Sequence, residues 1–240
     1  MNILIPMAGL GTRFPIDIYK KPKPLIEINS IPMILRAIQS LDLDGTYLFI
    51  IRKSEFSEEL KKHLNSIENK THIEEIDYST EGPASSSLIL SNFINSNEEL
   101  IIANCDQIME WDSKVFLHNA RLYDGLIVTY YANTNKNSYA KLNHIGQVVE
   151  IREKEVISST SLNGIHYWKQ GSLFVQSAKE MISVNDRARN GEFYIGPTYN
   201  YLIKKRYNIG VYHIPNEMHH AVGDPDDYDK FIKYEKNKTK

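Results

Sequence analysis

Through residue 103, the hydrophobic positions follow two patterns in turn: short continuous runs, and positions three or four residues apart. Continuous apolar runs are typical of strands buried on both faces, whereas the wider spacing is typical of amphipathic helices. The runs predict strands over residues 2–7, 47–51, 73–76 and 100–103. The wider spacing predicts helices over residues 34–41, 56–67 and 83–94, the last of them opened by Pro83.

Regular alternation of strands and helices favours βαβ units and a mostly parallel sheet. Ligands of such sheets bind at the carboxyl ends of the strands. We therefore expect the functional residues to follow residues 7, 76 and 103.

After residue 112 the pattern changes to closely spaced strands. Hydrophobic runs over residues 126–131, 139–142 and 148–151, with Gly146 between the last two, predict antiparallel hairpins. A strand over 165–168, helices over 173–182 and 199–203, a strand over 209–214 and a helix from Pro225 complete the prediction. We expect one α/β domain over residues 1–240, with a parallel half (1–112) and a mixed, partly antiparallel half (113–240).

Composition narrows the class of protein. Of 240 residues, 42% are hydrophobic and 24% charged, which is ordinary for a globular domain and excludes a disordered chain. The formal net charge of −2 argues against nucleic acid as a partner. No apolar run approaches the roughly 18–20 residues of a membrane helix. The N-terminus is expected to be a strand and not a signal peptide, so we expect no membrane partner.

A single cysteine, Cys105, cannot form an internal disulfide, which fits a reducing compartment. We therefore expect a cytoplasmic protein. Beside an apolar strand end, Cys105 itself is expected to be a packing residue and not a nucleophile.

The segment Ala8-Gly9-Leu10-Gly11-Thr12-Arg13-Phe14 follows the first predicted strand directly. Glycines at such a turn let backbone N–H groups surround phosphate oxygens, and an arginine fork can hold two of those oxygens. An ordinary strand–helix turn is the alternative. The dinucleotide fingerprint is excluded because Phe14 stands where its third glycine would be, and no Gly-Lys-Ser/Thr follows to make a P-loop.

A lysine suited to phosphate follows in Lys21-Pro22-Lys23-Pro24-Leu25. Prolines on both sides of Lys23 restrict the backbone, so its ammonium group can be held with little loss of entropy. A solvated surface lysine is the alternative, and we expect Lys21 to be one.

Two segments together resemble the signature of the nucleotidyltransferases that make nucleotide sugars. They are Gly-Leu-Gly-Thr-Arg at residues 9–13 and Pro-Lys-Pro-Leu at residues 22–25. The resemblance extends along nearly the whole chain. It implies a GT-A-like, Rossmann-type α/β fold whose first half (1–112) binds a nucleoside triphosphate and whose second half (113–240) binds a phosphorylated acceptor. It implies catalytic roles for Arg13, Lys23 and Asp106. The implied nucleotide-binding residues are Met7, Ala8, Gly9, Gly11, Thr12, Arg13, Glu81, Gly82, Pro83, Ala84 and Asn104.

The resemblance also implies a divalent cation. Asn104-Cys105-Asp106-Gln107 resembles the family's acidic motif, in which Asp106 would bind Mg²⁺ or Mn²⁺. Many relatives carry a second aspartate near the closing glycine, but here His219 and His220 precede Ala221-Val222-Gly223. Either one of these histidines substitutes as a metal ligand, or Asp106 acts nearly alone with waters, which Mg²⁺ tolerates. A pair of ordinary loop histidines is the alternative.

The acceptor site is expected in the second half of the chain. A wall that mixes both charge signs with aromatic surface suits a zwitterion better than a neutral hexose, because a charge without a partner is costly to desolvate. The expected wall consists of Tyr139, Lys141, Glu153, Lys154, His166, Tyr167, Glu192 and Tyr194.

Within the family, the Asn-x-Asp-Gln form of the acidic motif resembles a subgroup found among surface-polysaccharide genes. This resemblance implies CTP as the nucleotide and an amino-acid-type phosphate, such as phosphoglutamine, as the acceptor, for capsule biosynthesis. A sugar-1-phosphate nucleotidyltransferase that uses UTP, dTTP or CTP stays open, as do a non-catalytic regulatory homologue and a homodimer. A GT-A glycosyltransferase stays open as well, although Asp106 is not part of an Asp-x-Asp motif.

Overall fold

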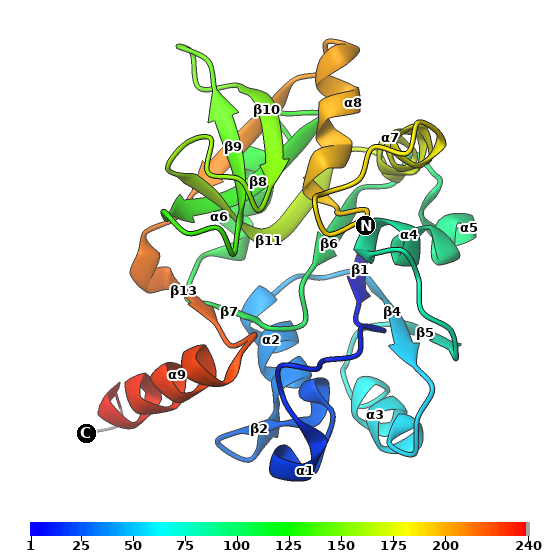
Figure 1. Cartoon of the computed structure of the whole chain (residues 1–240), viewed down its shortest axis with the longest axis vertical. Helices are drawn as coiled ribbons and strands as arrows, with labels where there is room; N and C mark the ends of the chain where they lie inside the picture. Colours follow the sequence, from blue (N-terminus) through cyan, green and yellow to red (C-terminus); the bar gives the residue numbers. More distant parts are fainter. Residues whose placement is uncertain (239–240) are drawn as a thin grey trace.

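The computed structural model describes residues 1–238, and residues 239–240 lie outside the described part. A twisted central sheet runs through the molecule with helices on both faces (Figure 1). Along its main path the strand order is β10-β9-β11-β6-β1-β4-β5, and β8 pairs with both β11 and β12. The strands are β1 (Asn2–Pro6), β4 (Thr46–Arg52), β5 (Thr71–Ile76), β6 (Leu100–Ala103), β8 (Gly125–Tyr131), β9 (Ser138–Leu142), β10 (Val148–Glu153), β11 (Thr160–Trp168) and β12 (Ile209–His213).

Smaller elements connect and cover these strands. Two short antiparallel pairs lie outside the main sheet: β2 (Glu27–Ile28) with β3 (Ile31–Pro32), and β7 (Gln107–Met109) with β13 (His219–Ala221). The α-helices are α1 (Ile16–Tyr19), α2 (Met33–Leu41), α3 (Ser57–Leu64), α4 (Pro83–Ser87), α5 (Ser91–Ile94), α6 (Ser113–Ala120), α7 (Gly171–Ser183), α8 (Tyr199–Lys204) and α9 (Pro225–Lys238). The 3₁₀ turns are η1 (Lys23–Leu25), η2 (Leu88–Leu90), η3 (Gly196–Thr198) and η4 (Asn216–Met218).

The predicted parallel sheet is confirmed. β1 pairs in parallel with β4 on one side and with β6 on the other, so that Leu4 lies opposite Leu48 and Ile102. The carboxyl ends of β1, β4 and β6 therefore meet at one edge of the sheet, together with the end of β5. This edge is where the sequence predicted the functional residues.

The mixed half continues the same sheet. β11 pairs antiparallel with β6, and its other pairings extend the sheet to β8 and β9. β8 and β12 pair in parallel, a pairing that close strand spacing alone did not predict. Because β11 joins both halves, side chains from the second half reach the edge where β1 and β6 end.

Most of the core lies in two layers separated by the sheet, and a third, smaller cluster contains Phe14, Val222 and Phe231. Alternate residues of β1 face opposite sides: Leu4 packs toward α4, α7 and α8, whereas Ile3 and Ile5 pack toward α2, α3 and α6. Trp168 and Tyr199 stack in the first layer, with ring planes 2° apart and centroids at 4.5 Å. Burial on both faces explains why these strands are continuous apolar runs in the sequence.

Some elements differ from the sequence expectations. The predicted helix over 83–94 is interrupted by the 3₁₀ turn η2, and it consists of α4, η2 and α5. The helix α6 was not predicted; its first turn is capped by the Asp112 carboxylate, which accepts hydrogen bonds from the backbone N–H groups of Lys114 and Val115. Within residues 1–238, no helix is both long and apolar enough to cross a bilayer.

Candidate active site

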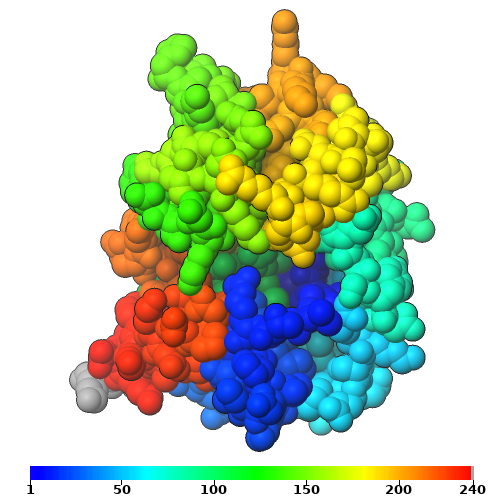
Figure 2. Space-filling model, viewed as in Figure 1, coloured from blue at the N-terminus to red at the C-terminus, as the bar shows by residue number. Residues whose placement is uncertain are grey.

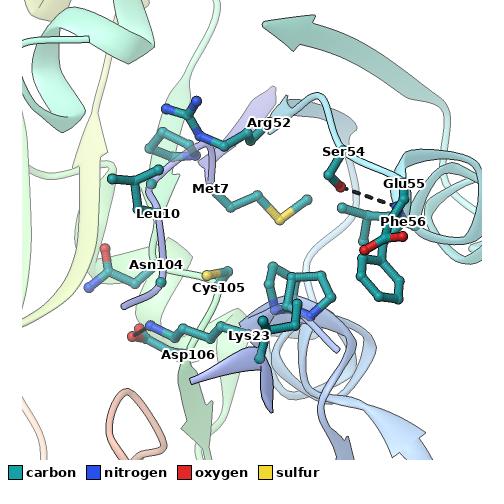
Figure 3. A pocket seen from close by; sticks show the side chains of 17 residues that line it. Met7, Leu10, Lys23, Arg52, Ser54, Glu55, Phe56, Asn104, Cys105 and Asp106 are labelled. Atoms are coloured by element: carbon teal, nitrogen blue, oxygen red, sulfur yellow. Dashed lines mark hydrogen bonds and ion pairs between the residues drawn. The ribbon is translucent and has the colours of Figure 1, made fainter. Parts of the chain in front are cut away.

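Two cavities meet at the carboxyl end of β6. The first, called here the glycine-loop cavity, has a volume of about 510 Å³ and lies beside the turn Gly9–Gly11, with Met7, Lys23 and Arg52 in its wall (Figure 3). The second, called here the hairpin cavity, has a volume of about 280 Å³ and is enclosed mainly by the second half of the chain. Asn104 and Asp106 line both cavities, so the strand end that carries them forms the boundary between the two. Figure 2 shows the hollow, between the second half of the chain above and the blue N-terminal segment below.

Lys23 and Asp106 form an ion pair at this boundary. Pro22 and Pro24 hold Lys23 at the start of η1, and both charged side chains are mostly buried, with 17% and 15% of their surface exposed. Burial alone would lower the pKa of Lys23, but the Asp106 carboxylate outweighs it and holds this pKa above its ordinary value. Lys23 is therefore a fully charged ammonium group at the junction of the cavities.

The second carboxylate oxygen of Asp106 faces no protein partner. Oδ1 is buried and accepts no hydrogen bond from the residues described in the structure. Gly223 lies against the same carboxylate, since a Cβ placed there would stand 2.6 Å from Oδ2. A buried, unpartnered anionic oxygen is a suitable ligand for a hard divalent cation. The donor set at Asp106 therefore fits Mg²⁺.

The glycine loop connects the two cavities. Gly11 takes the left-handed conformation (φ 61°), and its carbonyl accepts a hydrogen bond from the Phe14 N–H at 2.9 Å. Arg13 lies in the wall of the hairpin cavity, with Nη1 3.5 Å from the Gly223 carbonyl. The neighbouring Thr12 is exposed and does not line either cavity.

Cys105 lies next to the ion pair but is not suited to nucleophilic attack. Its side chain is buried, and that burial raises the pKa of the thiol to about 11. A thiol with this pKa carries almost no thiolate near neutral pH, and the thiolate is the reactive form.

The segment Thr80–Ala84 follows Ser79, which Arg52 connects to the glycine loop: Arg52 donates to the Ser79 hydroxyl and to the Ala8 carbonyl, each at 3.0 Å. Pro83 lines the hairpin cavity, whereas Glu81, Gly82 and Ala84 line neither cavity. Gly82 has φ 123°, and a Cβ there would stand 2.6 Å from the Phe193 carbonyl oxygen. The glycine is thus required by close contact with the second half of the chain.

The position of Asn104 depends on Gly164, a glycine of β11. A Cβ at Gly164 would stand 2.1 Å from Asn104 Nδ2, and the Asn104 backbone N–H donates to the Gly164 carbonyl at 3.1 Å. Glycine at this place in the strand lets β11 approach the end of β6 closely. The predicted residues Asn104 and Asp106 are held at the junction in this way.

Four residues of the expected acceptor wall line the hairpin cavity: Glu153, Lys154, His166 and Tyr194. Burial raises the pKa of Glu153 to about 6, although its carboxylate accepts a hydrogen bond from the Ser138 hydroxyl. Lys154 donates to the Tyr194 hydroxyl at 2.7 Å. Burial lowers the pKa of His166 to about 3, so this imidazole is neutral at physiological pH, and its buried Nδ1 has no partner among the described residues.

The other four residues of that wall do not line this cavity. Successive side chains of a strand face opposite sides, and Ser138 faces the cavity, so Tyr139 and Lys141 face away. The hydroxyl of buried Tyr139 bonds instead to the Thr134 backbone, at 2.7 Å from its nitrogen and 2.9 Å from its oxygen. Placing Tyr139 and Lys141 in the wall was wrong.

Tyr167 and Glu192 are also displaced from the predicted wall. In β11, His166 faces the cavity, so Tyr167 faces the opposite layer, where its hydroxyl donates to Glu99 at 2.9 Å. Glu192 is exposed outside the cavity, and its carboxylate accepts a hydrogen bond from the Tyr194 hydroxyl at 2.6 Å. Glu192 therefore reaches the cavity only through Tyr194.

The two candidate metal histidines point in different directions. In β13, His219 faces the hairpin cavity and shares a hydrogen bond with the Gln107 side chain. Burial lowers the pKa of His219 to about 4. His220 faces α9, where its ring lies 4.5 Å from that of Tyr234 and 5.0 Å from that of Phe231. Among residues 1–238, no three or more His, Cys, Asp or Glu side chains gather where they could hold a metal, so a histidine as a second ligand beside Asp106 stays a prediction. Of the two histidines, His219 shares the hairpin cavity with Asp106 and His220 does not.

Solved structures share this architecture. A nucleoside-diphosphate-sugar pyrophosphorylase from Vibrio cholerae superimposes with a TM-score of 0.85 at 24% identity, over 96% of this chain and 99% of that one. A UDP-glucose pyrophosphorylase in complex with UDP-glucose gives 0.79 at 18% identity, over 99% and 98%. An inositol-1-phosphate CTP transferase from T. maritima gives 0.73 at 13% identity, over 97% and 93%.

The chain has the fold of these proteins. No protein-family model matches it, and no curated protein does. The superposition with solved structures shows the GT-A-like fold that the family resemblance implied.

The fold also brings Arg52, Lys136 and Asp224 to the two cavities. Arg52 ends β4 and donates to the Ala8 carbonyl at 3.0 Å, at the base of the glycine loop. Lys136 and Asp224 line the hairpin cavity and pair at 3.3 Å. No motif marks Arg52 or Lys136, although the position of Arg52 directly after a predicted strand is a signal that could have found it, and Asp224 directly precedes the helix predicted from Pro225.

Proposed function

We propose that this protein is a nucleotidyltransferase that joins a nucleoside triphosphate to a phosphorylated small molecule and releases pyrophosphate. The observation that carries the proposal is the Lys23–Asp106 pair, placed where the glycine-loop cavity meets the hairpin cavity. A reaction between two phosphate groups needs cations and an anionic metal ligand where the groups meet. This boundary supplies all of them from one short stretch of loop and one strand end.

In the proposed reaction, a phosphate oxygen of the acceptor attacks the α-phosphorus of the triphosphate. A new P–O bond forms, and the bond between the α-phosphorus and the bridging oxygen breaks, with pyrophosphate as the leaving group. The nucleophile is already ionised near pH 7, because the second pKa of a phosphate monoester is about 6. No general base is therefore required of the protein.

The chain's own cations lower the repulsion between the two anions. Arg13 and the backbone N–H groups of the glycine loop hold the triphosphate, and Lys23 neutralises charge where both phosphate groups meet. Asp106 holds Mg²⁺, and the bound cation would neutralise developing charge on the phosphate oxygens. The mostly buried position of Lys23 strengthens its attraction for phosphate, because water screens it less there.

The finer proposal is that CTP is the nucleotide and an amino-acid-type phosphate, with phosphoglutamine as the best candidate, is the acceptor. The supporting feature is the hairpin cavity, in which Glu153 and Lys154 offer one charge of each sign. A zwitterion can pair with both, whereas a neutral hexose offers them hydroxyl groups and no opposite charge. On this proposal the enzyme works in the cytoplasm, alone or as a homodimer, and supplies a precursor for surface polysaccharide.

A sugar 1-phosphate is the second candidate acceptor. Two structures with the same fold are pyrophosphorylases of nucleotide sugars by name, and one is an inositol-1-phosphate CTP transferase. Glu153 and Lys154 are adjacent and could neutralise each other in the presence of such an acceptor. The two candidates differ in the acceptor and share the chemistry at Lys23 and Asp106.

The decisive experiment measures pyrophosphate release with each of CTP, UTP, dTTP, ATP and GTP against a panel of phosphorylated acceptors. We expect CTP with phosphoglutamine to be faster than CTP with any hexose 1-phosphate. Faster release with a hexose 1-phosphate, under any triphosphate, contradicts the acceptor assignment and supports nucleotidyl transfer. No release above background with any pair contradicts nucleotidyl transfer itself.

A further inference from the structure

The segment that connects α7 to η3 crosses from the second half of the chain to the nucleotide side of the cleft. It is called here the strap and comprises residues 185–194. In Figure 2 this yellow part of the chain lies at the rim of the hollow. The strap contacts the segment Thr80–Ala84 through Arg187 and Phe193, and Tyr194, the next residue, lines the hairpin cavity.

Backbone hydrogen bonds attach the strap to the first half. The Phe193 N–H donates to the Glu81 carbonyl at 2.8 Å, and the Ala84 N–H donates to the Phe193 carbonyl at 3.0 Å. Gly82 between them has no room for a side chain, because the Phe193 carbonyl oxygen and nitrogen would stand 2.6 and 2.7 Å from its Cβ. A shift of Phe193 therefore moves the whole Thr80–Ala84 segment.

Arg187 links the strap to that segment through one nitrogen of its guanidinium group and bonds within the strap through the other two. Nη2 pairs with the Glu81 carboxylate at 2.6 Å, Nη1 donates to the Gly191 carbonyl at 2.8 Å, and Nε donates to Asn185 at 2.5 Å. The Arg187 Cζ lies 4.1 Å from the centre of the Phe193 ring. A planar fork whose three nitrogens each make a hydrogen bond fixes geometry in a way that a lone lysine could not.

Tyr194, which follows Phe193 directly, reaches groups of the hairpin cavity. The Tyr194 hydroxyl donates to Glu192 at 2.6 Å and accepts from Lys154 at 2.7 Å, and Lys154 Nζ lies 4.9 Å from the centre of the Tyr194 ring. Tyr194 and Lys154 both line the hairpin cavity. Contacts therefore run without a break from Glu81, through Arg187 and the strap, to Lys154.

We propose that Arg187 is a positioning residue that couples the two substrate sites, so that nucleotide and acceptor each strengthen binding of the other. This rests on the proposed function and on the family resemblance, which implies that Glu81, Gly82, Pro83 and Ala84 bind the nucleotide; we place the acceptor in the hairpin cavity, which Pro83 also lines. Arg187 lines neither cavity. It ensures that ordering Thr80–Ala84 also orders Phe193 and Tyr194. Since such coupling is reciprocal, it is measurable from either substrate.

Arg189 provides a matched control. It lies two residues further along the same strap and pairs with Glu155 at 3.1 Å, within the second half of the chain. Its side chain is 79% exposed, so its ion pair contributes little to stability. Arg189→Gln removes the same charge from the strap as Arg187→Gln but leaves the link to Glu81 in place.

The test uses the substrate pair that the wild-type enzyme turns over fastest. The KM for the triphosphate is measured at saturating acceptor and at an acceptor concentration well below its own KM. We expect the wild type to lower its nucleotide KM by about 5-fold or more when acceptor saturates. We call the nucleotide KM at low acceptor divided by that at saturating acceptor the KM ratio. Arg187→Gln and Glu81→Gln should each reduce the KM ratio to about 1, and combining them should cause no further change. Arg189→Gln should keep the wild-type KM ratio. The exchanged pair Arg187→Glu with Glu81→Arg should recover part of the ratio.

A second readout does not depend on activity. Amide hydrogen exchange at residues 80–84 should become faster in Arg187→Gln than in the wild type, and not in Arg189→Gln, with both variants folded by circular dichroism. If the wild type is active but its nucleotide KM does not depend on the acceptor concentration, the coupling is refuted and nucleotidyl transfer is not. The same holds if Arg187→Gln keeps the wild-type dependence. A wild type that releases no pyrophosphate with any substrate pair overturns the proposed function, and the coupling with it.

Discussion

Lys23 and Asp106 stand 83 positions apart in the chain and form an ion pair where the two cavities meet. One side chain comes from a proline-bounded 3₁₀ turn near the N-terminus, and the other comes from the loop that follows β6. The pair places a cation beside the carboxylate that we propose as the metal ligand, at the proposed point of phosphoryl chemistry.

The first prediction concerns Asp106. Asp106→Asn removes the anionic oxygen that fits Mg²⁺, so pyrophosphate release should fall to background, and EDTA should silence the wild type until Mg²⁺ is restored. Asp112→Asn is the control, because Asp112 caps α6 and asparagine caps helices equally well. Activity that survives EDTA, or an active Asp106→Asn variant, would refute the assignment of Asp106 as the metal ligand.

The second prediction concerns Lys23. If this ammonium group stabilises the transition state, Lys23→Ala should lower kcat by on the order of 10²-fold while KM for the triphosphate changes much less. Lys21→Ala is the matched control, since Lys21 pairs with Glu59 at 2.9 Å at the surface. Steady-state kinetics of both variants check this. A change confined to KM would mean that Lys23 binds substrate without accelerating the reaction.

The third prediction separates the two adjacent histidines. His220→Ala removes a ring packed on Phe231 and Tyr234, so the variant should unfold at a lower temperature and keep the wild-type Mg²⁺ requirement. His219→Ala, in contrast, alters the wall of the hairpin cavity, so it should raise the Mg²⁺ concentration needed for half-maximal rate. Thermal unfolding and Mg²⁺ titration of the rate distinguish them. Identical Mg²⁺ titrations for both variants and the wild type would make both histidines structural.

The fourth prediction follows from the raised pKa of Glu153. Glu153 ionises near its ordinary value of 4.5 in the unfolded chain, but the folded protein holds this pKa at about 6. Between these values the folded state binds more protons, so the free energy of unfolding falls as the pH rises from about 4.5 to about 6. The contribution is at most about 2 kcal/mol.

Glu153→Gln removes this titration, so the variant should gain stability relative to the wild type as the pH rises through that window. Urea unfolding at a series of pH values measures the difference. Parallel pH profiles for the two proteins would mean that Glu153 titrates alike in the folded and unfolded chains.

Local sequence was sufficient for the parallel sheet and for the loop that carries its chemistry. Strands such as β1 and β4 are buried on both faces, so each is a continuous apolar run that needs no knowledge of its partner. The glycine loop and Lys23 could be found for a similar reason, because Gly9, Gly11, Pro22 and Pro24 act on backbone conformation next to them in the chain.

Only the tertiary structure decided which side chains share a cavity. The sequence predicted Tyr139 and Tyr167 in the acceptor wall. In the structure, strand alternation and register point both side chains away from the hairpin cavity, and Ser138 and Lys136 line it instead. The Arg187–Glu81 pair joins residues 106 positions apart, through a loop whose sequence carries no pattern for such a contact. Hydrophobic spacing reports whether a position is buried, whereas the identity of its neighbours depends on sheet order and register, which are set by packing of the whole chain.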